Sequence, residues 1–187
     1  MPDFATVPAD VVSADETYLM HTYGRLPVEL VSAKGAVLTD STGKDYLDFL
    51  GGIGCASLGH CHPADVAAVR DQAEKLWQVG NYFYIENRNE AAQAISGLLS
   101  TVTDESGHVE GSTGTTWRTF FGNSGAEANE GAIKVARRWG EVKLGGAAGI
   151  VSAHKSFHGR TLATLAATGQ DVFHKSFQPL PAGFASV

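Results

Sequence analysis

An alternation of apolar and amphipathic segments in the second half of the chain constrains the fold most. TWRTFFG (116–122) and AAGIVSAH (147–154) are both rich in residues that favour strands. Between them, SGAEANEGAIKVARRWG (124–140) repeats apolar residues at helical spacing, and TLATLAAT (161–168) is a further helical segment. Strand, helix, strand and helix in succession predict a parallel sheet with crossover helices, and therefore an α/β fold.

The first half of the chain has a different pattern of apolar and polar residues. Three short alternating runs begin at Val28, at 36–40 and at 45–50, and turn-forming residues separate them. They predict a small antiparallel meander, preceded by an arm with a helix at 14–23. A glycine-rich loop follows at 51–60.

Two helices are predicted next, followed by a polar loop. The helices cover 64–77, with Trp77 on the apolar face, and 90–100. The segment 101–116 is rich in Ser, Thr and Gly, which predicts a surface loop. We therefore divide the chain into 1–60, the arm and meander, and 61–187, the first part of a parallel-sheet domain.

Charge and composition exclude several functions. The net charge of −6 argues against a broad surface for nucleic acid or anionic membranes. No apolar run approaches the length of a membrane span, and the first residues lack a basic start, so we expect a cytoplasmic protein. Cys55 and Cys61 are expected to be free thiols, and GHCHP (59–63) to be a turn before a helix rather than a metal site, because no second ligand cluster accompanies it.

The start of the 124–140 helix is a candidate anion site. Ser124 occupies the N-cap position, and Glu127 three residues later completes a capping-box pattern. A helix start at the carboxyl end of a parallel strand offers unpaired amides, and Gly125 and Ala126 let a ligand approach them. The pattern fits a phosphate site, and it equally fits a simple capped helix.

A second loop is expected on the same edge of the sheet. SAHKSFHGRT (152–161) follows the next predicted strand. Phe157 offers an aromatic face on which a flat ring could stack, and Arg160 offers a planar cation for a carboxylate. A core phenylalanine and a surface arginine are the alternatives.

Three motifs together resemble the class III pyridoxal-phosphate aminotransferases, nearest to the acetylornithine/ornithine branch. They are LDFLGGIGCASLGHCHP, GNSGAEANEGAIKVAR and FHGRTLATLAATGQ, and the resemblance runs from about Tyr23 to Val187. It implies fold type I, with the meander in the small domain, and pyridoxal 5′-phosphate as the cofactor.

The resemblance also assigns roles to single residues. Ser124, Gly125 and Ala126 match the loop that holds the cofactor phosphate. Phe157 matches the aromatic residue on the pyridine ring, with His158 beside it. Arg160 matches the arginine that binds the substrate carboxylate. Tyr23 resembles a tyrosine that faces the substrate, and a role in N-terminal packing is the alternative.

The implied reaction moves an amino group between N-acetylornithine, or an ornithine-like amine, and 2-oxoglutarate in arginine biosynthesis. The resemblance also implies a homodimer for the full-length protein. At Ile53 the ornithine enzymes resemble one another in carrying tyrosine, which favours the acetylornithine side.

The family's Schiff-base lysine and the aspartate that pairs with the pyridinium nitrogen lie further along than the matched motifs. Lys134 lies about 15 Å down the helix from Ser124, and Lys155 is not at the family's lysine position. We therefore expect no catalytic residue in this chain and no activity from it alone. We also expect a sheet cut midway to aggregate or to be held by a partner.

Three other interpretations remain open at this point. The chain is a non-catalytic remnant with a role in dimerisation or assembly, part of another class III ω-aminotransferase, or an unrelated phosphate-binding α/β module.

Overall fold

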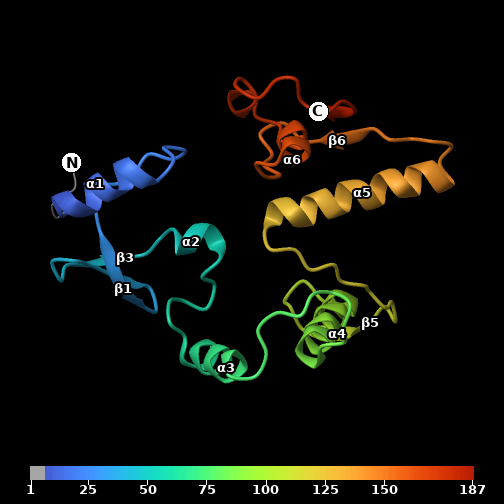
Figure 1. The fold of residues 1–187 in the computed structure, drawn as a ribbon. Coiled ribbons are helices and arrows are strands. Elements are labelled where there is room, and N and C mark those ends of the chain that lie inside the picture. The colour runs from blue at the N-terminus through green and yellow to red at the C-terminus, as the bar shows by residue number, and fades with distance from the viewer. Residues whose placement is uncertain (1–6) are drawn as a thin grey trace. The chain divides into compact units, whose positions relative to one another are not determined.

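The computed structural model describes residues 7–187, which form two compact units that divide between Phe83 and Tyr84. Each unit is described by itself (Figure 1). The predicted division at residue 60 stays a prediction, and residues 1–6 of the predicted arm lie outside the described residues.

The first unit contains the predicted meander. Strands β1 (Leu30–Lys34), β2 (Val37–Asp40) and β3 (Asp45–Leu47) pair antiparallel in chain order (Figure 1). The unit's helices are α1 (Ala9–Tyr18), α2 (Gly51–Gly54) and α3 (Pro63–Ala73).

Two helix predictions and one loop prediction in this unit were wrong in detail. Helix α1 begins earlier than expected because Pro8, at its N-cap, fits the entry to a first turn. Helix α3 ends at Ala73, and Trp77 is 86% exposed with its indole N–H donated to the Ala73 carbonyl. The predicted glycine-rich loop opens with the short turn α2, in which Ile53 has a left-handed φ of 61°.

The carboxylate of Asp40 closes the β2–β3 turn. Asp40 is only 1% exposed, and its Oδ1 accepts the amides of Thr42 and Lys44 at 2.9 and 3.0 Å. The Tyr46 hydroxyl donates to Oδ2 at 2.8 Å. Burial alone would raise the pKa of Asp40, but the hydrogen bonds from Thr42, Lys44 and Tyr46 lower it to about 2.

A second carboxylate ties the glycine-rich segment to the meander. Asp48 Oδ2 lies 2.7 Å from His60 Nε2, and Oδ1 accepts the amides of Leu50 and Gly51. His60, followed by the Gly51 amide, lowers the pKa of Asp48. Cys55 and Cys61 are both free and exposed, and residues 7–187 contain no group of three potential metal-binding side chains.

The second unit combines two small sheets with four helices. Strands β4 (Thr101–Thr103) and β5 (Val109–Ser112) are antiparallel, whereas β6 (Ile150–Ser152) and β7 (Phe184–Ser186) are parallel. The helices are α4 (Glu86–Ser100), α5 (Gly125–Lys143), α6 (Leu162–Ala167) and the 3-10 turn η1 (Asp171–Phe173). The parallel pair confirms the predicted α/β class. None of the helices in residues 7–187 has both the length and the apolar character that crossing a membrane requires.

Two predictions about this unit were wrong. TWRTFFG forms no strand, because no other described segment pairs with it, and its Phe120 packs against Gly131 of α5 instead. The predicted loop 101–116 contains the β4–β5 hairpin. Asp104 Oδ1 closes that turn by accepting the amides of Ser106 and His108, at 2.9 and 2.8 Å.

Helix α5 is anchored to the parallel pair near its carboxyl end. Arg137 donates to the carbonyls of Ala148 and Ala182 and stacks 5.0 Å from the centroid of the Phe184 ring. Gly140 meets the chain just before β6, and a Cβ there would overlap the carbonyl oxygen of Ala147.

We predict opposite signs for the same substitution in two helices. Gly140→Ala should lower the free energy of unfolding by about 1–3 kcal/mol, because the added methyl displaces the backbone at Ala147. Gly97→Ala should raise it by about 0.5–1 kcal/mol, since Gly97 lies inside α4 with nothing within 4 Å of its Cβ position. Urea unfolding checks both, and stabilisation by Gly140→Ala would contradict the packing described.

Acid should destabilise the meander through Asp40. Folding lowers the pKa of Asp40 from 3.8 to about 2, so the ionised carboxylate stabilises the fold above its unfolded pKa. That contribution is lost as the pH falls from about 4 towards 2. The Asp40→Asn variant should have a lower free energy of unfolding than wild type at pH 7. Its free energy of unfolding should also change less as the pH falls through this range. Urea unfolding midpoints measured as a function of pH test this prediction. Asp71→Asn is the control, because it makes the same change at an exposed carboxylate. If the midpoints of wild type and Asp40→Asn changed equally with pH, the prediction would be contradicted.

Candidate functional site

The start of α5 has the capping geometry that its sequence predicts. Ser124 is extended (φ −154°, ψ 162°), and its Oγ accepts the Glu127 amide at 3.2 Å. The Glu127 carboxylate in turn accepts the amide of Asn123 at 2.7 Å. These bonds fix the direction in which the chain enters the helix.

The next two amides remain available to a ligand. Gly125 and Ala126 are the first two residues of α5, and neither amide has an acceptor among residues 7–187. The space where a Gly125 side chain would stand is open, with nothing within 4 Å. Together with the positive end of the helix dipole, this is a set of donors suited to an anion.

The loop after β6 packs directly on this helix start. A Cβ on Gly159 would lie 2.7 Å from the Ala126 Cβ and 2.7 Å from the Thr164 hydroxyl. Gly159 also has φ +134°, a backbone that other residues rarely adopt. The structure thus brings both predicted loops together, at a contact that only glycine permits.

Hydrogen bonds hold the loop in that place. The Asn129 side chain donates to the His158 carbonyl at 2.8 Å, and the His158 amide donates to the Thr168 hydroxyl at 3.0 Å. The Thr161 hydroxyl donates to the Glu130 carboxylate, and Thr161 also opens α6. The backbone around His158 is therefore fixed from α5 and α6 at once.

Phe157 and Arg160 lie beside a third residue that the sequence did not single out. Phe157 is 56% exposed, and its ring meets that of Phe173 edge to face at 6.2 Å. The Arg160 guanidinium carbon is 4.2 Å from the Phe173 centroid and 5.7 Å from that of Phe157. The only sequence signal for Phe173 is an aromatic residue shortly after the FHGRT motif.

The sequence raised three other candidates, Tyr23, Lys134 and Lys155. Tyr23 belongs to the first unit, where it is 65% exposed and its carbonyl accepts from Arg25, so its substrate role stays a prediction. Lys134 lies on the exposed side of α5. Lys155 is exposed before Phe157, with a left-handed φ of 63° and its amide bound to Gly169.

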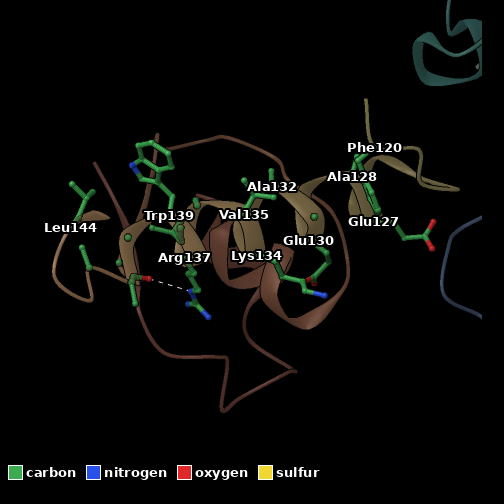
Figure 2. A pocket seen from close by; sticks show the side chains of 17 residues that line it. Phe120, Glu127, Ala128, Glu130, Ala132, Lys134, Val135, Arg137, Trp139 and Leu144 are labelled. Carbon is green, nitrogen blue, oxygen red and sulfur yellow. Dashed lines mark hydrogen bonds between the residues drawn. The ribbon is translucent and has the colours of Figure 1, made fainter. Parts of the chain in front are cut away.

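A hollow runs along the side of α5 rather than over its start. It measures about 1120 Å³, and Figure 2 shows Phe120 at one end and Trp139 and Leu144 at the other. Val135 and Trp139 are largely exposed within it. The hollow lies beside, not in, the candidate site.

Comparison with known sequences identifies the family. Residues 18–187 match the family described as Aminotransferase class-III. The chain is 47% identical over 178 residues to acetylornithine aminotransferase of Caldanaerobacter subterraneus, covering 95% of this chain and 42% of that protein. It is 44% identical over 177 residues to the enzyme of the same name from Methanocaldococcus jannaschii, covering 94% and 41%. The chain thus spans about two fifths of the length of the curated relatives it matches.

Solved structures give the same result. The fold matches ornithine aminotransferase of Toxoplasma gondii with a TM-score of 0.82 at 28% identity, over 95% of this chain and 39% of that one. A second structure of that enzyme has pyridoxal phosphate at its active site. These matches confirm the expected fold class, and with the sequence match over most of its length the chain belongs to the class III aminotransferase family.

Proposed function

We propose that this chain is the N-terminal portion of an aminotransferase that binds pyridoxal 5′-phosphate. The reaction moves an amino group between N-acetylornithine, or an ornithine-like amine, and 2-oxoglutarate in arginine biosynthesis. The observation that carries the proposal is the contact of Gly159 with Ala126, which joins the two motif loops into one site. The acetylornithine aminotransferases among the relatives support the choice of substrate.

The donors at the start of α5 fit a phosphate dianion. The amides of Gly125 and Ala126 have no acceptor among the described residues, and the space before them is open. Ser124 adds a hydroxyl, which in this structure points to the Glu127 carboxylate at 3.3 Å and would turn to the phosphate. Three donors at the positive end of a helix match the oxygens of a phosphate.

The neighbouring loop fits the cofactor ring. Phe157 is more than half exposed, so part of its surface is open to a flat ligand. The backbone at His158 is fixed by Asn129 and Thr168. Phe157 and His158 are therefore the residues that would hold the ring.

Bound pyridoxal phosphate supplies an electron sink that stabilises negative charge at the reacting carbon. The residues of this chain bind and orient. Arg160 presents a planar fork of N–H groups that can hold a carboxylate by two hydrogen bonds. We expect the proton-transferring lysine to come from sequence beyond these motifs, because neither Lys134 nor Lys155 matches its position, and we therefore expect the 187-residue chain to be inactive alone.

The proposal extends to a homodimer, as the resemblance implies, and to a cytoplasmic location, as expected from the sequence. Ile53 supports the acetylornithine side of the branch. Another ω-aminotransferase and a non-catalytic remnant remain the alternatives, and the following assay separates all three.

We predict that the protein that carries this chain, loaded with pyridoxal phosphate, converts 2-oxoglutarate to glutamate fastest with N-acetylornithine. Ornithine and γ-aminobutyrate are the comparison donors. Preference for γ-aminobutyrate would indicate another ω-aminotransferase, and no turnover with any donor would contradict an enzyme.

Arg160→Lys should lower kcat/KM for N-acetylornithine by about tenfold to a hundredfold, since lysine cannot bind a carboxylate through a planar fork. Arg138→Lys is the matched control, because Arg138 is exposed and pairs only with Glu141 among described residues. Equal kcat/KM values for wild type and Arg160→Lys would show that Arg160 does not bind the substrate.

Gly159→Ala should weaken cofactor binding by about tenfold or more, because the methyl group pushes the loop away from Ala126. Gly145→Ala is the control, as Gly145 also has a positive φ (+65°) but nothing within 4 Å of its Cβ position. Cofactor dissociation constants from visible absorbance measure the difference. Unchanged affinity in Gly159→Ala would refute the joined site.

A further inference from the structure

Phe173 makes the shortest aromatic contact of the arginine proposed to bind the substrate. The Arg160 guanidinium carbon lies 4.2 Å from the Phe173 centroid, against 5.7 Å for Phe157. The two rings also touch each other, edge to face, at 6.2 Å. Phe173 therefore contacts both the proposed cofactor-ring residue and the proposed carboxylate-binding residue.

The backbone that carries Phe173 is held by its surroundings. Phe173 ends the turn η1, in which its amide donates to the Gln170 carbonyl at 3.1 Å. Gln170 also donates to the Ser156 carbonyl, at 3.0 Å. The next residue, His174, has Nε2 at 3.0 and 2.8 Å from the carbonyls of Leu165 and Thr168. The turn is thus tied both to the loop that carries Phe157 and to α6.

The N–H groups of the Arg160 guanidinium remain available to bind a carboxylate. A cation–π contact with a ring uses none of the guanidinium N–H groups as hydrogen-bond donors to a carboxylate or carbonyl. No carboxylate among residues 7–187 forms an ion pair with Arg160. An incoming carboxylate would meet an arginine whose orientation is already restricted, which lowers the entropy lost on binding.

We propose that Phe173 is a positioning residue that sets the specificity of the site for donors with a carboxylate. It acts through Arg160, whose guanidinium it holds beside Phe157. The proposal rests on the proposed function, since it takes Arg160 as the residue that binds the carboxylate.

A pair of substrates isolates this effect. N-acetyl-1,4-diaminobutane is N-acetylornithine without its carboxylate. In the full protein, Phe173→Leu should raise KM for N-acetylornithine about five- to tenfold and leave that for N-acetyl-1,4-diaminobutane unchanged. Phe173→Tyr keeps a ring and should behave as wild type. Phe177→Leu is the matched control. It also removes an exposed aromatic ring, but Phe177 makes no cation–π contact with Arg160.

The possible results separate the inference about Phe173 from the proposed function on which it rests. If Phe173→Leu raises KM for both substrates equally, or for neither, Phe173 has no part in recognising the carboxylate and the inference is wrong. If the wild type turns over neither substrate, or Arg160→Lys leaves KM for N-acetylornithine unchanged, the proposed function fails instead.

A readout without turnover tests the stacking itself. Phenylglyoxal modifies accessible guanidinium groups, and peptide mass spectrometry follows each arginine separately. Phe173→Leu should speed the modification of Arg160 about three- to tenfold relative to Arg118, an exposed arginine used as the internal reference. An unchanged ratio would show that the ring does not hold Arg160.

Discussion

The close approach of Gly159 to Ala126 is the contact on which the proposed site depends. Ala126 is small and lies in the first turn of α5, and Gly159 has no side chain, so two backbones meet where larger residues would separate them. The start of α5 and the aromatic loop after β6 are thereby brought into direct contact. Ser124 and Glu127 fix one side of this contact through the helix cap, while Asn129 and Thr168 fix the other through the backbone of His158.

The site divides its work between backbone and side chains. The proposed phosphate donors are mainly main-chain amides, whose positions are set by α5. The proposed recognition of the ring and of a carboxylate falls to Phe157 and Arg160, both of which contact Phe173. Since the cation–π contact of Arg160 with Phe173 takes up none of its N–H groups as donors to oxygen, it does not compete with the proposed binding of a carboxylate.

What the sequence predicted was mostly local. The cap of α5 and the meander were predictable because Ser124, Glu127 and the turn residues signal them over a few positions. The meeting of the two loops was predicted from the rule that parallel strands end on one edge, but only the second loop follows a strand here, and the contact of Gly159 with Ala126 brings the loops together. TWRTFFG was predicted as a strand and is none here, because a strand depends on a neighbour that local sequence does not describe.

Two other features were not predicted from the sequence, for different reasons. The β4–β5 hairpin had a signal, Asp104 followed by Ser and Gly, which the polar composition of the segment obscured. The stacking of Phe173 on Arg160 joins residues thirteen positions apart through the fold of α6 and η1, and no periodic pattern marks it. Tyr23 and the assigned site roles remain predictions.

The central claim is that the start of α5 and the Gly159 loop form one phosphate-binding site. Comparing the affinity of the protein for pyridoxal 5′-phosphate with that for pyridoxal, which lacks the phosphate, tests it most directly. The account predicts that pyridoxal phosphate binds at least about a hundredfold more tightly, and that a bulky Gly125→Val substitution at the helix start removes most of this difference. Equal affinities for the two ligands, or a difference that survives in Gly125→Val, would contradict it.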